Sequence, residues 1–302
     1  MVLRVFLWKI LVPEQTLEIF IGRFFSHAVL LPQAMCEGLA FFTLVTLLLG
    51  AKLAIMLPIF AAIVLVSILA GTALRWRSLE AGFGSDDYPQ YAMIRGVYPV
   101  ERSPFDLFNF VGGRDEVPAL RSSGAVPWWT HPELRLAMMR PLSSALIVID
   151  HAMFGDKLVG FHLHSMLWWA FLVFCVAVLL RELLPVQVAA VAVVLFAVEE
   201  GHGLPVAWLA NRSALVSLSL GLLGLWGHIR WRRGGHRPAA VLSVLMFSLA
   251  LLAGEWTFPV FAYLLAFELL GVEGPLWRRA LALMPAALLV LEITDPDLLS
   301  AG

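Results

Sequence analysis

The first long apolar segment, Leu53–Leu74, is the feature that most restricts how this chain can fold. The segment contains no Asp, Glu, Lys or Arg. A helix needs about 20 consecutive apolar residues to cross a bilayer. A run of this length and composition does not suit the core of a small soluble domain, so it predicts a transmembrane helix.

The remainder of the chain repeats this pattern. Hydrophobic residues make up 60% of the sequence and charged residues only 14%, which leaves too little polar surface to cover a water-soluble protein of 302 residues. Unpaired backbone groups are not tolerated in lipid, so the apolar runs predict an all-α polytopic transmembrane bundle. The further predicted helices are Gly160–Leu180, Leu183–Val198, Ser213–Trp231, Pro238–Gly254, Trp256–Leu270 and Ala280–Leu291.

Polar residues mark the remaining regions of the chain. Residues 1–52 are predicted to be a cytoplasmic or interfacial N-terminal segment, because Glu37 divides their apolar part. Residues 53–302 form the predicted transmembrane module. Within it, residues 75–135 are a polar first loop that we expect to contain short helices. Arg135–Phe154 is helical in pattern, but its charges leave too short an apolar run to require a crossing.

Orientation follows from the positions of basic residues, because short cytoplasmic loops collect Lys and Arg. The clearest basic loops are His228–Arg237 and Leu276–Arg279. Placing both in the cytoplasm and counting back through the spans puts Glu199–Arg212 outside. The first loop, residues 75–135, is then extracytoplasmic as well.

This topology gathers the unusual polar residues at one level. Ionisable groups at membrane depth are costly and tend to be paired or functional, so their convergence indicates a polar cavity that opens outward. The alternative is a set of ordinary interface residues. The residues are Asp86, Asp87, Arg140, His151, His162, Glu199, Glu200, His202, Asn211, Arg212 and Glu255.

Two of these features suggest chemistry. Asp86 and Asp87 lie in a Gly- and Pro-flanked turn, where a carboxylate can act as general base toward an acceptor hydroxyl; a solvated loop is the alternative. Arg140 shares a helical face with Ser144 and His151. Its guanidinium suits bidentate binding of phosphate, and the alternative is an arginine that extends to the lipid headgroups.

Metal-binding patterns are weak in this sequence. Cys36 and Cys175 are too few for a disulfide framework or a cysteine-rich metal site. His162 and His164 are two residues apart on a predicted helix and point to nearly opposite sides. His202 stands beside two glutamates but in no zinc motif. No metal ligand is assigned, and a divalent cation stays open as a cofactor.

Residues 140–170 contain in order an Arg-Pro pair, a Phe-Gly pair and a Gly-Phe-His-Leu run, and residues 196–212 end in an arginine. This order of motifs resembles that of the GT-C-type membrane glycosyltransferases related to the protein O-mannosyltransferases. The sequence before Glu255 is similar to the group's Lys-Glu motif, with Gly254 in place of lysine. Asp86 and Asp87 stand where the group has its first-loop acidic motif.

The resemblance implies transfer of a sugar from a polyprenyl-phosphate donor to an acceptor outside the membrane. It implies that Asp86 or Asp87 is the catalytic base. The family usually continues with further spans, so we expect a truncated C-terminus. A bacterial cytoplasmic (inner) membrane is the expected location, with membrane lipid but no nucleic acid as a partner. The expected substrate-binding residues are Arg140, His151, His162, Glu200, His202, Arg212 and Glu255.

Two alternatives stay open. In a transporter or lipid-handling protein, the same polar residues would line a path without covalent chemistry, although no inverted repeat is visible. A truncated, non-catalytic relative of the GT-C proteins is the other alternative. The sugar, the acceptor and the oligomeric state have no signature in the sequence.

Overall fold

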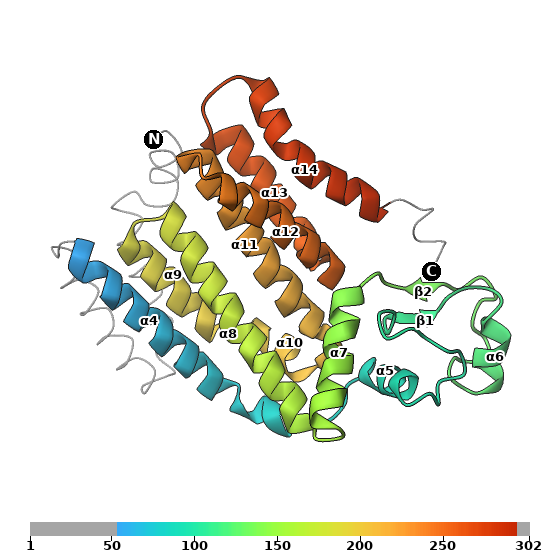
Figure 1. The fold of residues 1–302 in the computed structure, drawn as a ribbon. Coiled ribbons are helices and arrows are strands. Elements are labelled where there is room, and N and C mark those ends of the chain that lie inside the picture. The colour runs from blue at the N-terminus through green and yellow to red at the C-terminus, as the bar shows by residue number, and fades with distance from the viewer. Residues whose placement is uncertain (1–52, 295–302) are drawn as a thin grey trace, which may run out of the picture.

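A computed structural model describes residues 53–294, and helices dominate that part of the chain (Figure 1). The predicted N-terminal segment, residues 1–52, lies outside the described residues. The helices are α4 (Leu53–Leu74), α5 (Asp87–Ile94), α6 (Val117–Ser122), α7 (Pro141–Phe154), α8 (Leu158–Leu183), α9 (Val186–Val198), α10 (Gly203–Ala207), α11 (Arg212–Gly234), α12 (Arg237–Ala253), α13 (Phe258–Ala266) and α14 (Leu276–Thr294).

Several of these helices have the length and composition of membrane spans. Three stretches qualify by both criteria: Met56–Leu74, Leu158–Leu183 and Leu209–Gly234. A fourth is α9 together with Glu200–Ala207, a pair bent by 52° that qualifies only as one broken span. The prediction of a mostly helical structure is confirmed, and three to four of its helices are long and apolar enough to span a membrane.

Prolines explain two of the helix boundaries that were predicted wrongly. A helix was predicted over Arg135–Phe154, but α7 begins at Pro141. Arg140 has φ −134° and ψ 55°, because a residue that precedes proline is disfavoured in the helical conformation. In the same way, the helix predicted from Leu183 begins at Val186, directly after Pro185.

The central helix of the bundle is α11, which packs between α8 and α12. Its glycines allow a close approach to α12: a Cβ at Gly227 would lie 2.9 Å from the Ala239 carbonyl oxygen, and one at Gly224 would lie 3.0 Å from the Phe247 ring. This agrees with the packing role of small residues in membrane helix bundles. On the other side, α4, α8 and α9 share a core that includes Trp169, which is fully buried.

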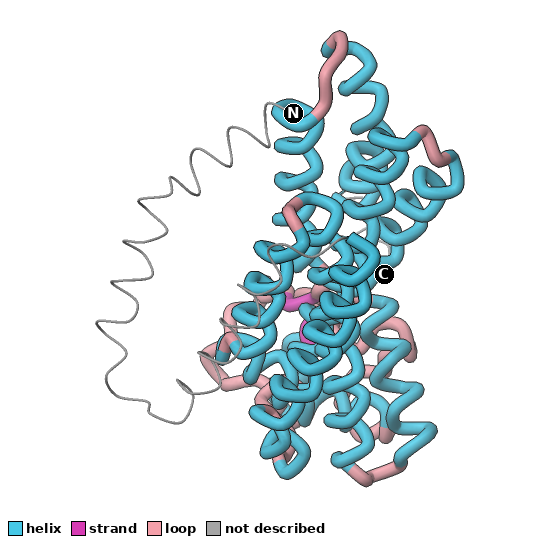
Figure 2. The backbone as a smooth tube through the Cα atoms, turned by 90° about the vertical axis from the view of Figure 1, so that its left-hand side faces the viewer, coloured by secondary structure: helices cyan, strands magenta, loops and turns pink. Residues whose placement is uncertain are grey.

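The first loop folds into a small unit with its own core at one end of the bundle (Figure 1). The unit contains α5 and α6, as predicted, but also a short antiparallel ladder between β1 (Asn109–Val111) and β2 (Leu136–Ala137). The all-α prediction was therefore wrong for these two strands, the only ones in residues 53–294 (Figure 2). We call this end of the bundle the loop end.

Arg75 joins α4 to α9 at the loop end. Its guanidinium donates to the carbonyl oxygens of Ala197, at 2.9 Å, and of Glu199, and it lies over the ring of Trp169. A cation at the C-terminus of a helix satisfies carbonyls that lack helical partners and interacts favourably with the helix dipole. Arg75 therefore ties the end of α4 to the end of α9.

Candidate functional site

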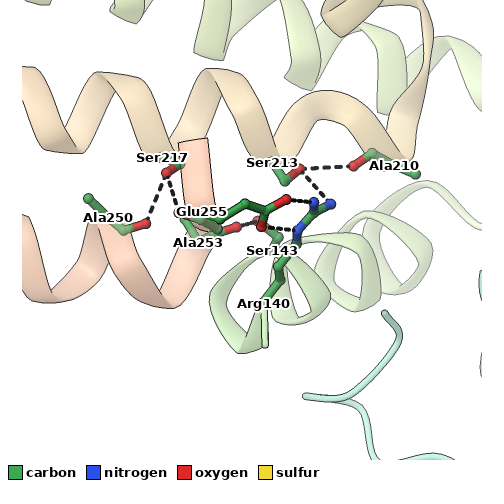
Figure 3. Close-up of polar contacts among 9 residues, drawn as sticks. Arg140, Ser143, Ala210, Ser213, Ser217, Ala250, Ala253 and Glu255 are labelled. Carbon is green, nitrogen blue, oxygen red and sulfur yellow. Dashed lines mark hydrogen bonds and ion pairs between the residues drawn. The ribbon is translucent and has the colours of Figure 1, made fainter. Parts of the chain in front are cut away.

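At the loop end, the guanidinium of Arg140 donates hydrogen bonds to side chains from two other helical segments. Arg140 Nε donates to Glu255 Oε2 at 2.9 Å and Nη2 donates to Oε1, while Nη1 donates to Ser213 Oγ at 3.2 Å. Figure 3 shows these contacts. The ring of Phe108 lies 4.8 Å from the guanidinium carbon. The Arg140 side chain is only 10% exposed, so its paired N–H donors are fixed in direction. We call Arg140, Ser213 and Glu255 the Arg140 cluster.

Local sequence sets the position of Arg140. Pro141 occupies the first turn of α7, where its missing N–H costs nothing. Ser143, in the same turn, donates from Oγ to the Ala253 carbonyl oxygen at 2.6 Å, which attaches α7 to the end of α12 (Figure 3). Arg140 therefore points from the start of one helix toward the end of another.

Glu255 reaches Arg140 because the chain turns sharply at Gly254. This glycine has φ 154°, a conformation that favours glycine over any other residue. Burial is the largest single influence and would raise the pKa of Glu255, but the hydrogen bond and charge of Arg140, together with a backbone hydrogen bond, outweigh it and hold the pKa below its ordinary value of 4.5.

Asp87 connects the first loop to the bundle. Its Oδ1 accepts from the Ala210 backbone N–H at 2.7 Å and its Oδ2 from the Gly84 N–H at 2.6 Å. The Ala210 carbonyl in turn accepts from Ser213 Oγ at 3.1 Å, so the backbone of Ala210 links the hydrogen bond of Asp87 to those of Ser213 and Arg140. Burial raises the pKa of the Asp87 carboxyl.

Asp86 has a different environment from its neighbour. The residue is half-buried and directly precedes α5. Its carboxylate makes no hydrogen bond or ion pair with any residue between 53 and 294. The acidic pair therefore separates into an anchored carboxylate, Asp87, and an unengaged one, Asp86.

A second cluster of charges lies inside the bundle, and sequence reasoning missed two of its members. Arg212 Nη1 is 2.5 Å from Asp150 Oδ2, and His164 Nδ1 is 2.5 Å from Asp150 Oδ1. The Trp168 indole N–H can only donate, and it points at His164 Nε2 at 2.9 Å. His164 Nε2 is therefore the acceptor, and Nδ1–H donates to Asp150. We call Asp150, His164 and Arg212 the Asp150 cluster.

The sequence contains a feature that could have identified the Asp150 cluster. Asp150 is an acidic residue in the apolar helix α7 and is fully buried, and ionisable residues in such positions are usually paired. Arg212 was singled out from the sequence, but its partner was not. The Arg212 side chain lies inside the protein. It is 2% exposed, whereas the Arg140 side chain is 10% exposed.

His162 and His164 point in different directions, as their spacing predicted. His162 Nε2–H donates to the Ala81 carbonyl oxygen at 2.9 Å and thereby holds the segment after α4 against α8. The His162 side chain is fully buried. It links two segments and is not exposed toward a ligand.

Three other expected site residues make no hydrogen bond or ion pair with the Arg140 cluster in the described part of the chain. His151 packs against the edge of Tyr91, with ring centroids 5.7 Å apart. Glu200 is exposed at the start of a 3₁₀ turn. His202 is half-buried, and its ring centroid lies 4.4 Å from that of Phe196.

Candidate metal ligands are scattered. Among residues 53–294, no group of three or more His, Cys, Asp or Glu side chains is arranged to hold a metal ion. Most of the described carboxylates with short contacts are engaged by arginine, histidine or backbone N–H groups, and Asp106 accepts from the Asn109 side-chain amide at 2.9 Å. Comparisons of the chain with protein families, with characterised proteins and with solved structures found no match.

Proposed function

We propose that this protein is a membrane glycosyltransferase that moves a sugar from a polyprenyl-phosphate-linked donor to an acceptor outside the membrane. One observation carries the proposal. Arg140, at the end of a bundle of apolar helices, has a fixed guanidinium whose paired donors face a single carboxylate, Glu255. Guanidinium groups bind phosphate with the same bidentate geometry.

The phosphate of the donor would take the place of the Glu255 carboxylate. The Glu255 side chain is 47% exposed, whereas Arg140 is 10% exposed, so the glutamate can move toward solvent while the arginine stays in position. Ser213 and the Phe108 ring would continue to hold the guanidinium. The leaving phosphate would then meet a cation in a site that excludes much of the water, where electrostatic stabilisation is strong.

Asp86 would be the base of the reaction. The acceptor hydroxyl attacks the anomeric carbon and its proton passes to the Asp86 carboxylate. The bond from that carbon to the phosphate oxygen breaks, and polyprenyl phosphate leaves with the electron pair. Asp87 would be a positioning residue, because both of its oxygens accept backbone hydrogen bonds. It fixes the turn that carries Asp86.

The chain would be a multi-pass protein of a bacterial cytoplasmic membrane, with the loop end outside. In addition to the helices that qualify by length, α12, α13 and α14 would cross or enter the bilayer. Single cysteines at Tyr88, Leu204 and Gly234 test this orientation, since all three positions are exposed. An impermeant thiol reagent on intact cells should label positions 88 and 204 but not 234. Equal labelling of all three would refute it.

Binding of polyprenyl phosphate to the purified protein tests the proposed site. Arg140→Ala should weaken binding by about 10-fold or more, because a hydrogen-bonded charge pair is lost. Arg140→Lys should recover only part of the affinity, since an ammonium cannot reproduce the paired donors. Arg95→Ala, at an exposed arginine of the first loop, is the control. Equal affinity of wild type and Arg140→Ala would refute the proposal.

A further inference from the structure

Among residues 53–294, the end of the bundle opposite the loop end carries more arginines than acidic residues. The C-termini of α8 and α11 and the N-termini of α12 and α14 lie toward that end (Figure 1), and hydrogen bonds from α11 and α14 join these two helices to neighbouring segments. We call this the arginine end. Its arginines are Arg181, Arg230, Arg232, Arg233, Arg237, Arg278 and Arg279, and its acidic residues are Glu182, Glu268 and Glu273.

The glutamates compensate only part of this charge. Glu268, in the π-helical segment Phe267–Gly271, is fully buried and is bound by Arg232 at 2.7 Å and by His228 at 2.6 Å. Glu182 is shared between Arg230 at 3.4 Å and Arg233 at 3.5 Å. These last two distances are long for charge-assisted hydrogen bonds, so both arginines keep donors for another anion.

Two exposed arginines have no acidic partner among the described residues. Arg237 begins α12, and Arg278 lies in the first turn of α14. The guanidinium of Arg278 lies over the Trp277 ring, 5.1 Å from its centroid, and Trp277 itself is 59% exposed. Tryptophan rings concentrate at the level of lipid headgroups, and arginine binds phosphate there.

We propose that the arginine end binds the headgroups of anionic phospholipids in the leaflet that it faces. Charge complementarity identifies the headgroup. A lipid is favoured over a soluble phosphate because the arginines adjoin helices with exposed apolar side chains, such as Leu281 at 55% and Leu288 at 55%, which acyl chains would contact. This inference rests on the chain lying in a membrane and is independent of the transfer reaction.

The test compares the full-length protein in nanodiscs of phosphatidylcholine alone and of phosphatidylcholine mixed with phosphatidylglycerol, with retained lipid measured by native mass spectrometry. Wild type should retain phosphatidylglycerol selectively. Each arginine near a lipid surface contributes about five-fold to binding. Arg237→Gln with Arg278→Gln should therefore lower selectivity by roughly 25-fold. Neither change breaks an internal ion pair, so the fold should persist.

The matched control is Arg95→Gln with Arg114→Gln, which removes the same charge from the first loop. It should keep the wild-type selectivity. Arg237→Lys with Arg278→Lys should keep most of it, because the charge stays. Equal retention of both lipids by wild type would overturn the proposal, as would unchanged selectivity in the Arg237→Gln and Arg278→Gln protein. If inorganic phosphate displaced phosphatidylglycerol and bound with the same affinity as the lipid, the assignment to a lipid would be overturned.

Discussion

Arg140 and Glu255 are 115 residues apart in the chain and form a bidentate ion pair at the loop end of the bundle. The arginine is held by Ser213 as well, whereas the glutamate is half exposed. In this pair the glutamate oxygens occupy the positions that two phosphate oxygens would occupy in the proposed complex. Glu255 would therefore compete with the donor for Arg140.

Removing this competition should strengthen binding of the donor phosphate. Partly exposed ion pairs contribute less than about 1 kcal/mol, so Glu255→Gln should tighten binding of polyprenyl phosphate by roughly 2- to 5-fold. Titration of the purified protein measures this. Glu200→Gln removes the same charge at an exposed position and should have a smaller effect. Weaker binding by Glu255→Gln would show that Glu255 assists the donor and does not compete with it.

Substitution of Asp86 should affect activity, whereas substitution of Asp87 should affect stability. Asp86→Asn keeps size and polarity but removes the proton acceptor, so kcat should fall by about 10²–10⁴-fold with donor binding preserved. Asp87→Asn loses one of two backbone hydrogen bonds and should lower stability by about 1 kcal/mol. Steady-state kinetics and thermal unfolding separate the two effects. Full activity in both variants would remove the pair from the mechanism and make Glu200 or Glu255 the better candidate for the base.

The buried carboxyl of Asp87 should make stability depend on pH. Burial raises its pKa above the ordinary value of 3.8, so the folded state holds the proton more tightly than the unfolded state. The contribution of Asp87 to stability is then full below about pH 3.8 and is lost as pH rises through the raised pKa. The difference in unfolding temperature between wild type and Asp87→Asn should shrink as pH rises across this window. A difference that grows with pH would contradict the assignment.

The Asp150 cluster should matter for stability. Asp150→Ala leaves Arg212 charged, buried and without its carboxylate, which should cost about 3–5 kcal/mol. Replacing both residues by apolar ones, with Asp150→Leu and Arg212→Met, should recover much of that loss. Unfolding in a fixed detergent measures both proteins. If the double variant is as unstable as Asp150→Ala, the pair has a role beyond charge compensation.

Much of the fold could be predicted from the sequence. Leu53–Leu74 is a helix with the predicted bounds, because a long uncharged apolar run has few other stable conformations in lipid. The predicted secondary structure was wrong where the preference of a local segment competes with contacts from residues far away in the chain. Leu136 and Ala137 join a strand because Asn109 and Val111 supply the partner backbone, and a pairing across the loop leaves little trace in either short segment.

The site was harder to predict than the fold. The sequence singled out Arg140 and Glu255 as unusual polar residues, yet nothing in it shows that they bind one another. It could not separate Asp86 from Asp87, because part of the difference between them comes from the Ala210 N–H, more than a hundred residues away. Residue type and spacing identify candidate groups, but only the packing of the helices pairs them.

Transfer of labelled sugar by the purified protein tests the central claim most directly. The assay incubates wild type, Asp86→Asn and Arg140→Ala with radiolabelled polyprenyl-phosphate hexoses and a membrane extract as the source of acceptors. Wild type should move label from the lipid to an acceptor and release polyprenyl phosphate, and both variants should lose most of this activity. Tight binding of the donor by wild type with no transfer would contradict a glycosyltransferase and support a lipid-handling protein.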